Sequence, residues 1–352
     1  MITRDRTIDT AKGIAIILVV WGHIIQRNLI LGGADFFLDP VYKWIYMFHM
    51  PLFFFIGGYL MAGSLKNKSP ASVFFSRCRG LLIPFFFWAV LDAFTSNVLC
   101  IVDGKTGFGH FSRDILEQLV FKPSVWVLST FFLLSALLLV CIWARKRLGM
   151  IVWLMVPVLF FLAPGNQYGG LYYAQWFLPF YAAGYLVQRR HFVIRFPWLR
   201  MVFRAVALAG LLVLGSFWIE SDYIYNNKML FHAGMLSAEG IRLLYRYLVG
   251  FLGIYLVWDI AVFFSTSSLG TALGLLGMYS LDIYMLQRYL VEGLYPRLVI
   301  GLHGQADLQS PVRFYAYVFF LGLVFAAICV VLSRFIIRRN KWLNIFLLGA
   351  RG

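Results

Sequence analysis

The residue whose type and position best suit chemistry is His23, in the first long apolar segment of the chain. It follows Gly13 by about 15 Å of helix at 1.5 Å per residue, which places it near the middle of a hydrocarbon core about 30 Å thick. At 100° per residue, Asp9, Lys12 and Arg27 fall within about 40° of His23 around that helix. This polar stripe predicts a helix face turned to a cavity, where an uncharged imidazole suits general-base catalysis. A histidine hydrogen-bonded to a neighbouring helix for packing fits the same spacing.

A second histidine, His49, stands just before Pro51 in the next apolar segment. Pro51 leaves the carbonyl of Met47 without its helical donor, so the sequence predicts a kink beside His49. His49 lies about eight residues in from the expected outer end of its helix and can therefore approach His23 in depth. A kinked helix whose histidine is satisfied locally is the alternative interpretation.

Two arginines, Arg77 and Arg79, come just before the third apolar segment. Guanidinium groups bind phosphate bidentately, so this pair is a candidate anion site. The alternative is ordinary positive charge at the inner membrane surface. Among the aromatic residues, Trp126 and Tyr279 are candidates to line a sugar site, although tryptophan and tyrosine also form interfacial belts.

Membrane-spanning helices must position these residues, because the composition excludes the other classes of protein. The chain has 352 residues, of which 61% are hydrophobic and 13% charged, whereas soluble domains carry about 25% charged residues. Long unbroken apolar runs also argue against a β-barrel, and four widely separated cysteines predict neither a disulfide framework nor a metal site. We expect an all-α polytopic membrane protein, one domain over 1–352, with about ten transmembrane helices. The expected segments are 13–31, 41–62, 81–102, 125–143, 148–163, 171–187, 201–219, 242–264, 269–291 and 312–337.

The distribution of charge predicts the orientation of these helices. With the N-terminus inside, the inner segments hold 20 of the 31 lysines and arginines, and most acidic residues fall in outer loops. This asymmetry follows the positive-inside rule, so both termini are expected in the cytoplasm and the protein in the inner (cytoplasmic) membrane. The net charge of +16 then reflects membrane topology, and nucleic acid is not an expected partner.

Three motifs occur together and in order: the run from Arg6 to His23, the run from Phe48 to Tyr59, and the Arg77-Cys78-Arg79 triplet with Pro84 behind it. In this arrangement the chain resembles the acyltransferase-3 family of membrane acyltransferases and is similar to its fucose 4-O-acetylase-like members. The similarity covers nearly the whole chain, including the count of ten helices. Two later stretches, 126–134 and 279–286, match more loosely.

The resemblance implies an enzyme that moves an acyl group, usually acetyl from acetyl-CoA, to a hydroxyl. Acceptors in the family are mostly sugars of surface polysaccharides, lipid-linked glycans or peptidoglycan. By position, His23 matches the family's essential histidine. Arg77 and Arg79 match its Arg-x-Arg motif, which is linked to acyl-CoA use, and Asp9 and Arg6 match conserved polar positions near the N-terminus.

Three positions depart from the family pattern. Lys12 stands where an arginine is common, which keeps the charge but loses the planar fork. Gln287 stands where many members place a histidine, so no second catalytic histidine is assigned there. Gly57 replaces a frequent serine. The expected catalytic residues are therefore His23 and Asp9. The expected acyl-CoA-binding residues are Arg77, Arg79, Lys12 and Arg6, and the expected acceptor-binding residues are His49, Trp126 and Tyr279. No metal is expected.

In the expected reaction, His23 either deprotonates the acceptor hydroxyl or is itself acylated first. Asp9 is about 21 Å from His23 along the helix and balances charge at the inner mouth. The implied partners are acyl-CoA, a sugar or glycan acceptor and membrane lipid, and homo-oligomerisation is left open. The alternative function is a transporter or flippase for a lipid-linked glycan, which needs a polar path but no acyl-CoA. A non-catalytic membrane scaffold is a third interpretation.

Overall fold

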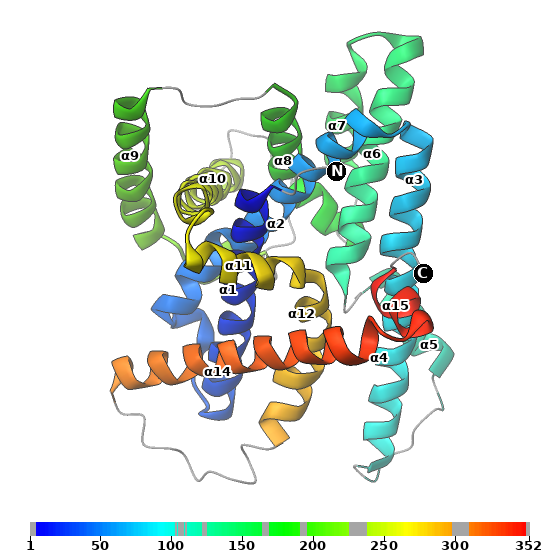
Figure 1. Ribbon diagram of the computed structural model, residues 1–352, viewed down its shortest axis with the longest axis vertical. Coiled ribbons are helices and arrows are strands. Elements are labelled where there is room, and N and C mark those ends of the chain that lie inside the picture. Colours follow the sequence, from blue (N-terminus) through cyan, green and yellow to red (C-terminus); the bar gives the residue numbers. More distant parts are fainter. Residues whose placement is uncertain are drawn as a thin grey trace. The chain divides into compact units, whose positions relative to one another are not determined.

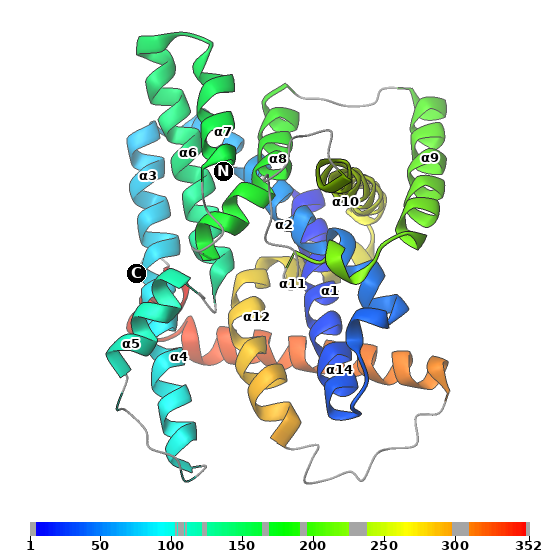
Figure 2. The same ribbon diagram turned by 180° about the vertical axis from the view of Figure 1, so that it is seen from behind.

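Helices make up all regular secondary structure in the part of the chain that the computed structural model describes, residues 5–102, 104, 109, 111–121, 125–163, 169–190, 196–224, 238–297 and 310–349 (Figures 1 and 2). Contacts divide the chain into two compact units. Unit 1 comprises Met1–Ile56, Val193–Asn227 and Leu236–Ile336, and unit 2 comprises Gly57–Phe192, Lys228–Met235 and Ile337–Gly352. The helix α2 (Pro40–Asn67) contributes to both units.

Unit 1 is built around α1 (Arg6–Leu31), which contacts α10, α11, α12, η5 and α14 (Figure 1). Asp5 caps its start, because a carboxylate oxygen of Asp5 accepts hydrogen bonds from the backbone N–H groups of Thr7 and Ile8. The other elements of unit 1 are η1 (Phe36–Leu38), the first part of α2, α9 (Pro197–Ser216), η4 (Glu220–Asp222), α10 (Ala238–Phe264), α11 (Ser268–Met278), α12 (Ser280–Gln287), η5 (Arg288–Leu294), α14 (Pro311–Leu332) and most of η6 (Ser333–Ile337).

Small residues let α1 and α11 pack backbone to backbone. A Cβ atom on Gly13 would collide with the main chain of Leu273, and one on Gly277 would collide with the carbonyl of Asp9. The hydroxyl of Thr10 lies 2.9 Å from the carbonyl oxygen of Arg6 and 3.3 Å from that of Gly270, so its one hydrogen is shared between α1 and α11. Close approach through glycine is a common way for membrane helices to associate, and here it sets the rotation of α1.

Unit 2 is built around α6 (Trp126–Leu148), which contacts α3, η2, α7 and α8. Gly58 of α2 packs directly on the backbone of Tyr181 in α8, where no side chain would fit. Gln175 of α8 donates to the carbonyls of Phe160 and Ala163 at 2.8 and 2.6 Å and so satisfies the C-terminal end of α7. The remaining elements are α3 (Pro70–Arg77), η2 (Cys78–Leu82), α4 (Ile83–Val102), α5 (Phe111–Leu116), η3 (Glu117–Phe121), α7 (Val152–Leu162), α8 (Gly169–Arg190) and α15 (Lys341–Leu348).

The all-helical, membrane-spanning character expected from the sequence is confirmed, whereas the count of ten is not. Seven helices of the described chain are long and apolar enough to cross a membrane, and an eighth span results if the pair Ser268–Met278 and Ser280–Arg297, bent by 60°, counts as one. All ten expected segments coincide with helices. Two of these helices are not among the seven: α7, which has only 11 residues, and α8. The cytoplasmic placement of both termini and the single domain over 1–352 stay predictions.

We predict that Gly277→Ala destabilises the protein by about 1–3 kcal/mol, because the added methyl group must push α1 away from α11. The matched control is Gly274→Ala, one turn earlier in α11, where the new Cβ would meet only the Cβ of Asp9 at an ordinary 3.8 Å. Replacing a helical glycine with alanine there should be neutral or slightly stabilising. Thermal unfolding of the purified proteins in detergent measures both variants. Equal melting temperatures would contradict the close contact.

Candidate functional site

His23 lies beside a carboxylate that the sequence analysis did not assign. Its Nδ1 is 3.3 Å from Oε1 of Glu292, and Nη2 of Arg27 is 3.4 Å from Oε2 of the same residue. His23 and Arg27 are four residues apart on α1 and therefore share one face of the helix. Both side chains are partly exposed, His23 by 24% and Arg27 by 31%. Glu292 thus lies between an imidazole and a guanidinium, close enough to form an ion pair with either.

The His23–Glu292 contact is not a fully formed hydrogen bond. Among the described residues, Nδ1 of His23 has no partner with suitable hydrogen-bond geometry, and neither has Nε of Arg27. The further charged or polar neighbours of the ring are Arg288 and Gln26. Hydrogen bonds of catalytic groups are often long or poorly aligned until substrate is bound, and a small rotation of the ring would align this one.

The element that carries Glu292 is the π-helical segment η5, and it is tied to α1 a second time. The hydroxyl of Tyr295 donates to Oδ1 of Asn28 at 2.9 Å, and the Tyr295 ring meets Phe325 edge to face at 5.7 Å. Single π-helical turns occur frequently at functional sites, because the extra residue redirects side chains. These contacts hold Glu292 on the side of α1 that carries His23.

The second predicted histidine, His49, is buried in unit 1 and is an electrostatic neighbour of His23. Its Nδ1 lies 2.8 Å from the carbonyl oxygen of Ile45, and the ring of Tyr46 packs edge-on against it at 4.6 Å. Tyr46 in turn stacks on Tyr42 at 3.8 Å, and its ring centroid lies 6.3 Å from that of Tyr223. Burial raises the pKa of Tyr223, so this phenol stays protonated at neutral pH. The local partner at Nδ1 agrees with the packing interpretation of His49, and its proximity to His23 agrees with the functional one.

The polar residues at the start of α1 form a separate group. Nζ of Lys12 lies 3.2 Å from Oδ1 of Asp9, whose side chain is largely buried, whereas Arg6 is exposed. Asp9 also packs against α11 through its backbone. Asp9 and Lys12 are about 16–21 Å from His23 along the helix, so they form a group separate from His23 and Arg27 on the same face of α1.

The remaining predicted residues are divided between the two units. Arg77 and Arg79 are half-buried in unit 2, Arg79 within the π-helical segment η2. Arg77 lies 3.9 Å from Sδ of Met61 and is an electrostatic neighbour of Tyr181. Trp126, also in unit 2, stacks on Tyr173 and Phe177 with ring centroids 4.1 and 5.7 Å apart. Tyr279, in unit 1, stands at the bend between α11 and α12.

Two of the buried acidic residues in unit 1 are structural ion-pair partners. Asp259 accepts hydrogen bonds from Nε of Arg200 at 2.9 Å and from Nε of Arg204 at 2.6 Å. Asp222 is paired with Arg242 through both carboxylate oxygens. A third acid, Asp282, accepts a hydrogen bond from Ser333. Within the described residues, no group of three or more histidine, cysteine, aspartate or glutamate side chains is arranged to hold a metal ion.

Comparison with known proteins gives a consistent result. Residues 5–334 match the family model Acyl_transf_3, described as an acyltransferase domain. Nodulation protein NolL of Sinorhizobium fredii (strain NBRC 101917 / NGR234) is 33% identical over 253 residues, which are 69% of this chain and 65% of that protein. Nodulation protein NolL of Mesorhizobium japonicum (strain LMG 29417 / CECT 9101 / MAFF 303099) is 32% identical over 243 residues, 65% of this chain and 60% of that protein. The match therefore spans less than two thirds of either relative. No solved structure matches the chain.

We predict a measurable coupling between Arg27 and Glu292. In a double-mutant cycle of Arg27→Gln and Glu292→Gln, the coupling in the free energy of unfolding should be about 0.5–1 kcal/mol, since both side chains are partly exposed. Pairing Arg27→Gln with Asp259→Asn provides the control, because the charged partners of Asp259 are Arg200 and Arg204. That pair should show no coupling. Strictly additive effects of Arg27→Gln and Glu292→Gln would rule out the bridge.

Proposed function

The chain belongs to the acyltransferase-3 family, and on this premise we propose that it is a membrane O-acyltransferase. It is a multi-pass membrane protein. In the proposed reaction it transfers an acetyl or related acyl group from cytoplasmic acetyl-CoA to a hydroxyl of a sugar in a cell-surface or lipid-linked glycan. The observation that carries the proposal is the contact of His23 with Glu292, because an imidazole oriented by a carboxylate is suited to move the proton that acyl transfer requires.

In the proposed reaction each residue of this group has its own role. Nδ1 of His23 faces Glu292, so Nε2 is the nitrogen left for the acceptor. Nε2 takes the proton of the sugar hydroxyl while the hydroxyl oxygen attacks the thioester carbonyl, the C–S bond breaks, and the leaving CoA thiolate receives that proton from Nε2. Glu292 stabilises the imidazolium formed in between, and Arg27 lies beside Glu292. In the acyl-carrier version, Nε2 attacks the thioester carbonyl, the C–S bond breaks, and the thiolate leaves and takes a proton from the medium. The hydroxyl oxygen then attacks the acyl-imidazole, the bond from the acyl carbon to Nε2 breaks, and the hydroxyl proton passes through the freed Nε2 to the medium.

The donor is assigned to the arginine-rich inner side. Arg77 and Arg79 supply two half-buried guanidinium groups, and such groups match the phosphates of acyl-CoA. Arg6 and Lys12 add positive charge at the start of α1, where Asp9 pairs with Lys12. This placement requires both termini to be cytoplasmic in an inner membrane, with the two units working as one acyltransferase domain. No metal takes part in the proposed reaction.

The acceptor is assigned to the outer side. We propose that His49, which lies near His23, binds the acceptor. Trp126 and Tyr279 are proposed to stack their rings on its sugar. A glycan acceptor fits the family and the polar stripe of α1.

We predict that His23→Gln lowers acceptor-dependent release of thiol from acetyl-CoA by about 100-fold or more, because general-base catalysis contributes about 10²–10⁴-fold. Glu292→Gln should lower the rate by about tenfold or more, since the ring loses its orienting carboxylate. The assay uses purified protein in nanodiscs with a panel of sugar acceptors, and melting temperatures verify folding. Asp35→Asn, an exposed turn residue whose amide keeps the cap, should leave the rate unchanged. A near-normal rate in folded His23→Gln would exclude both versions of the mechanism.

We predict that Arg77→Gln/Arg79→Gln raises the KM for acetyl-CoA by about tenfold or more while kcat changes less, because charge-assisted hydrogen bonds to phosphate are lost. The doubly substituted Lys variant should be intermediate, since lysine keeps the charge but not the fork. Lys66→Gln/Lys68→Gln, in the segment just before α3, removes the same charge and should leave KM unchanged. Equal KM values in all variants would contradict the donor assignment. A folded protein that neither binds nor cleaves acetyl-CoA would favour the transporter alternative.

A further inference from the structure

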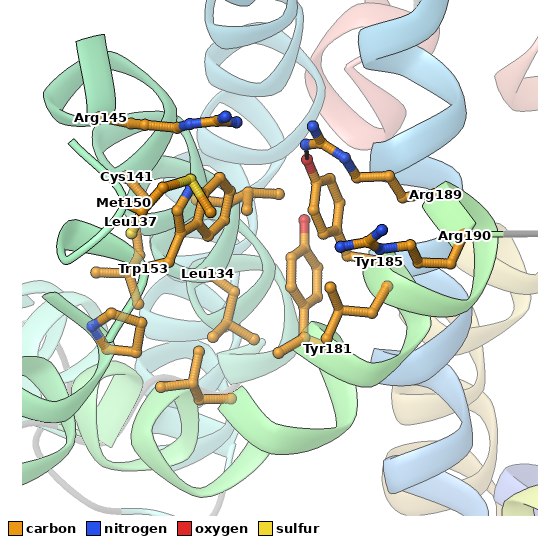
Figure 3. A pocket seen from close by; sticks show the side chains of 15 residues that line it. Leu134, Leu137, Cys141, Arg145, Met150, Trp153, Tyr181, Tyr185, Arg189 and Arg190 are labelled. Atoms are coloured by element: carbon orange, nitrogen blue, oxygen red, sulfur yellow. Dashed lines mark hydrogen bonds between the residues drawn. The ribbon is translucent and has the colours of Figure 1, made fainter. Parts of the chain in front are cut away.

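We propose that unit 2 holds a binding site for one molecule of a membrane lipid with a phosphate headgroup, in the cavity between α6, α7 and α8 (Figure 3). The cavity has a volume of about 510 Å³, and its lining includes Arg145, Arg189 and Arg190. The proposal is independent of the proposed reaction. It uses residues that the catalytic, donor and acceptor assignments do not include.

The three arginines converge on the mouth of the cavity. Arg145 lies in the last turn of α6 and Arg189 and Arg190 end α8, and Figure 3 shows them reaching toward the space from opposite sides. Arg189 is held in position, because its Nη1 donates to the hydroxyl of Tyr185 at 2.6 Å. The described lining residues include no acidic side chain, so the three positive charges are not neutralised within the cavity. Guanidinium groups arranged in this way match the oxygens of a phosphate ester.

A neighbouring hollow of about 330 Å³ shares Arg145 and Arg189 and adds Lys146. The positive charge typical of an inner membrane surface does not by itself explain why Arg145, Arg189 and Arg190 face one cavity. Arg147, only two positions from Arg145, turns away and lies over the ring of Trp143 at 5.1 Å, and it does not line the cavity. The arginines that face the cavity are therefore a distinct group within a basic segment.

Below the arginines the cavity becomes apolar. It extends to Leu134, about 16 Å along α6 from Arg145, and passes Leu137 and Leu178. Two apolar lining residues, Met150 and Leu186, are 65% and 52% exposed, so the apolar wall of the cavity continues to the surface of the unit, where a hydrocarbon chain can reach it. A polar mouth above an apolar depth is the shape of a lipid site, with the headgroup phosphate at the arginines and one chain between α6 and α8.

The wall favours a lipid chain over the arm of acyl-CoA. Its two tyrosine hydroxyls are already engaged: Tyr181 with Ser135 at 3.0 Å, and Tyr185 with Arg189. The described lining at this depth is mostly leucine, with the indole N–H of Trp153 as a further donor. The amides of a pantetheine arm would therefore leave most of their polar groups without hydrogen bonds, which costs free energy. A hydrocarbon chain has no such requirement.

Native mass spectrometry of delipidated protein tests the site with phosphatidic acid as the probe. Phosphatidylcholine, diacylglycerol and glycerol 3-phosphate test the headgroup and the chain separately, and coenzyme A tests the donor alternative. We expect phosphatidic acid to bind with 1:1 stoichiometry, and Arg145→Gln/Arg189→Gln/Arg190→Gln to weaken its binding about tenfold or more. Leu134→Trp, which fills the depth but keeps the arginines, should weaken it as well.

The matched control is Lys68→Gln/Arg147→Gln/Lys341→Gln, which removes three positive charges outside the cavity and should bind phosphatidic acid like the unmodified protein. Melting temperatures verify that each variant is folded, and Arg189→Lys provides a milder change if the triple variant is not. Equal weakening by the triple variant and its control would mean attraction by surface charge only and would overturn the proposal. Coenzyme A that binds the cavity and displaces phosphatidic acid, with loss of both in the triple variant, would overturn it in favour of a donor site.

Discussion

The close contact of α1 with α11 is the constraint on which unit 1 depends. Gly13 and Gly277 let the two backbones touch, and this fixes the rotation of α1 about its axis. Once that rotation is set, the face that carries His23 and Arg27 must meet η5, because a helix transmits its orientation rigidly along its length. The position of Glu292 opposite His23 is therefore a consequence of glycine packing about 15 Å away.

The ion pairs of this unit differ in how tightly the carboxylate is held. Asp259 accepts two arginine hydrogen bonds at 2.6 and 2.9 Å, which offsets the cost of placing a carboxylate in an apolar helix. Glu292 is bound more loosely, at 3.3 Å from His23 and 3.4 Å from Arg27. A carboxylate that already accepts short hydrogen bonds from two arginines gains little when a neighbouring group becomes charged. A loosely held carboxylate can strengthen its contacts when the neighbouring imidazole becomes charged, as the proposed proton transfer would have it do.

The sequence predicts those features that depend on one helix and misses those that depend on two. The stripe of Asp9, Lys12, His23 and Arg27 follows from helical periodicity alone. Glu292 was missed because the ninth expected segment ended at 291. A local signal was present, since a regular helix would place Arg288 and Glu292, four residues apart, on one face, although the π-helical segment changes that spacing. The contact with His23, in contrast, joins positions 269 residues apart, which periodicity cannot reveal. Likewise, Gln175 makes α8 less apolar. Its side chain donates hydrogen bonds to carbonyl oxygens at the end of α7, a contact between two helices that the sequence of α8 alone does not reveal.

The π-helical segments limit how far side-chain directions can be projected from the sequence onto helix faces. α1 is regular over its 26 residues, so 100° per residue holds from Asp9 to Arg27. The helix that carries Arg79 contains η2, and the one that carries Glu292 contains η5. One inserted residue rotates everything beyond it by about 100° relative to a regular helix. Arg79 and Glu292 therefore face directions that no uniform helical wheel assigns to them.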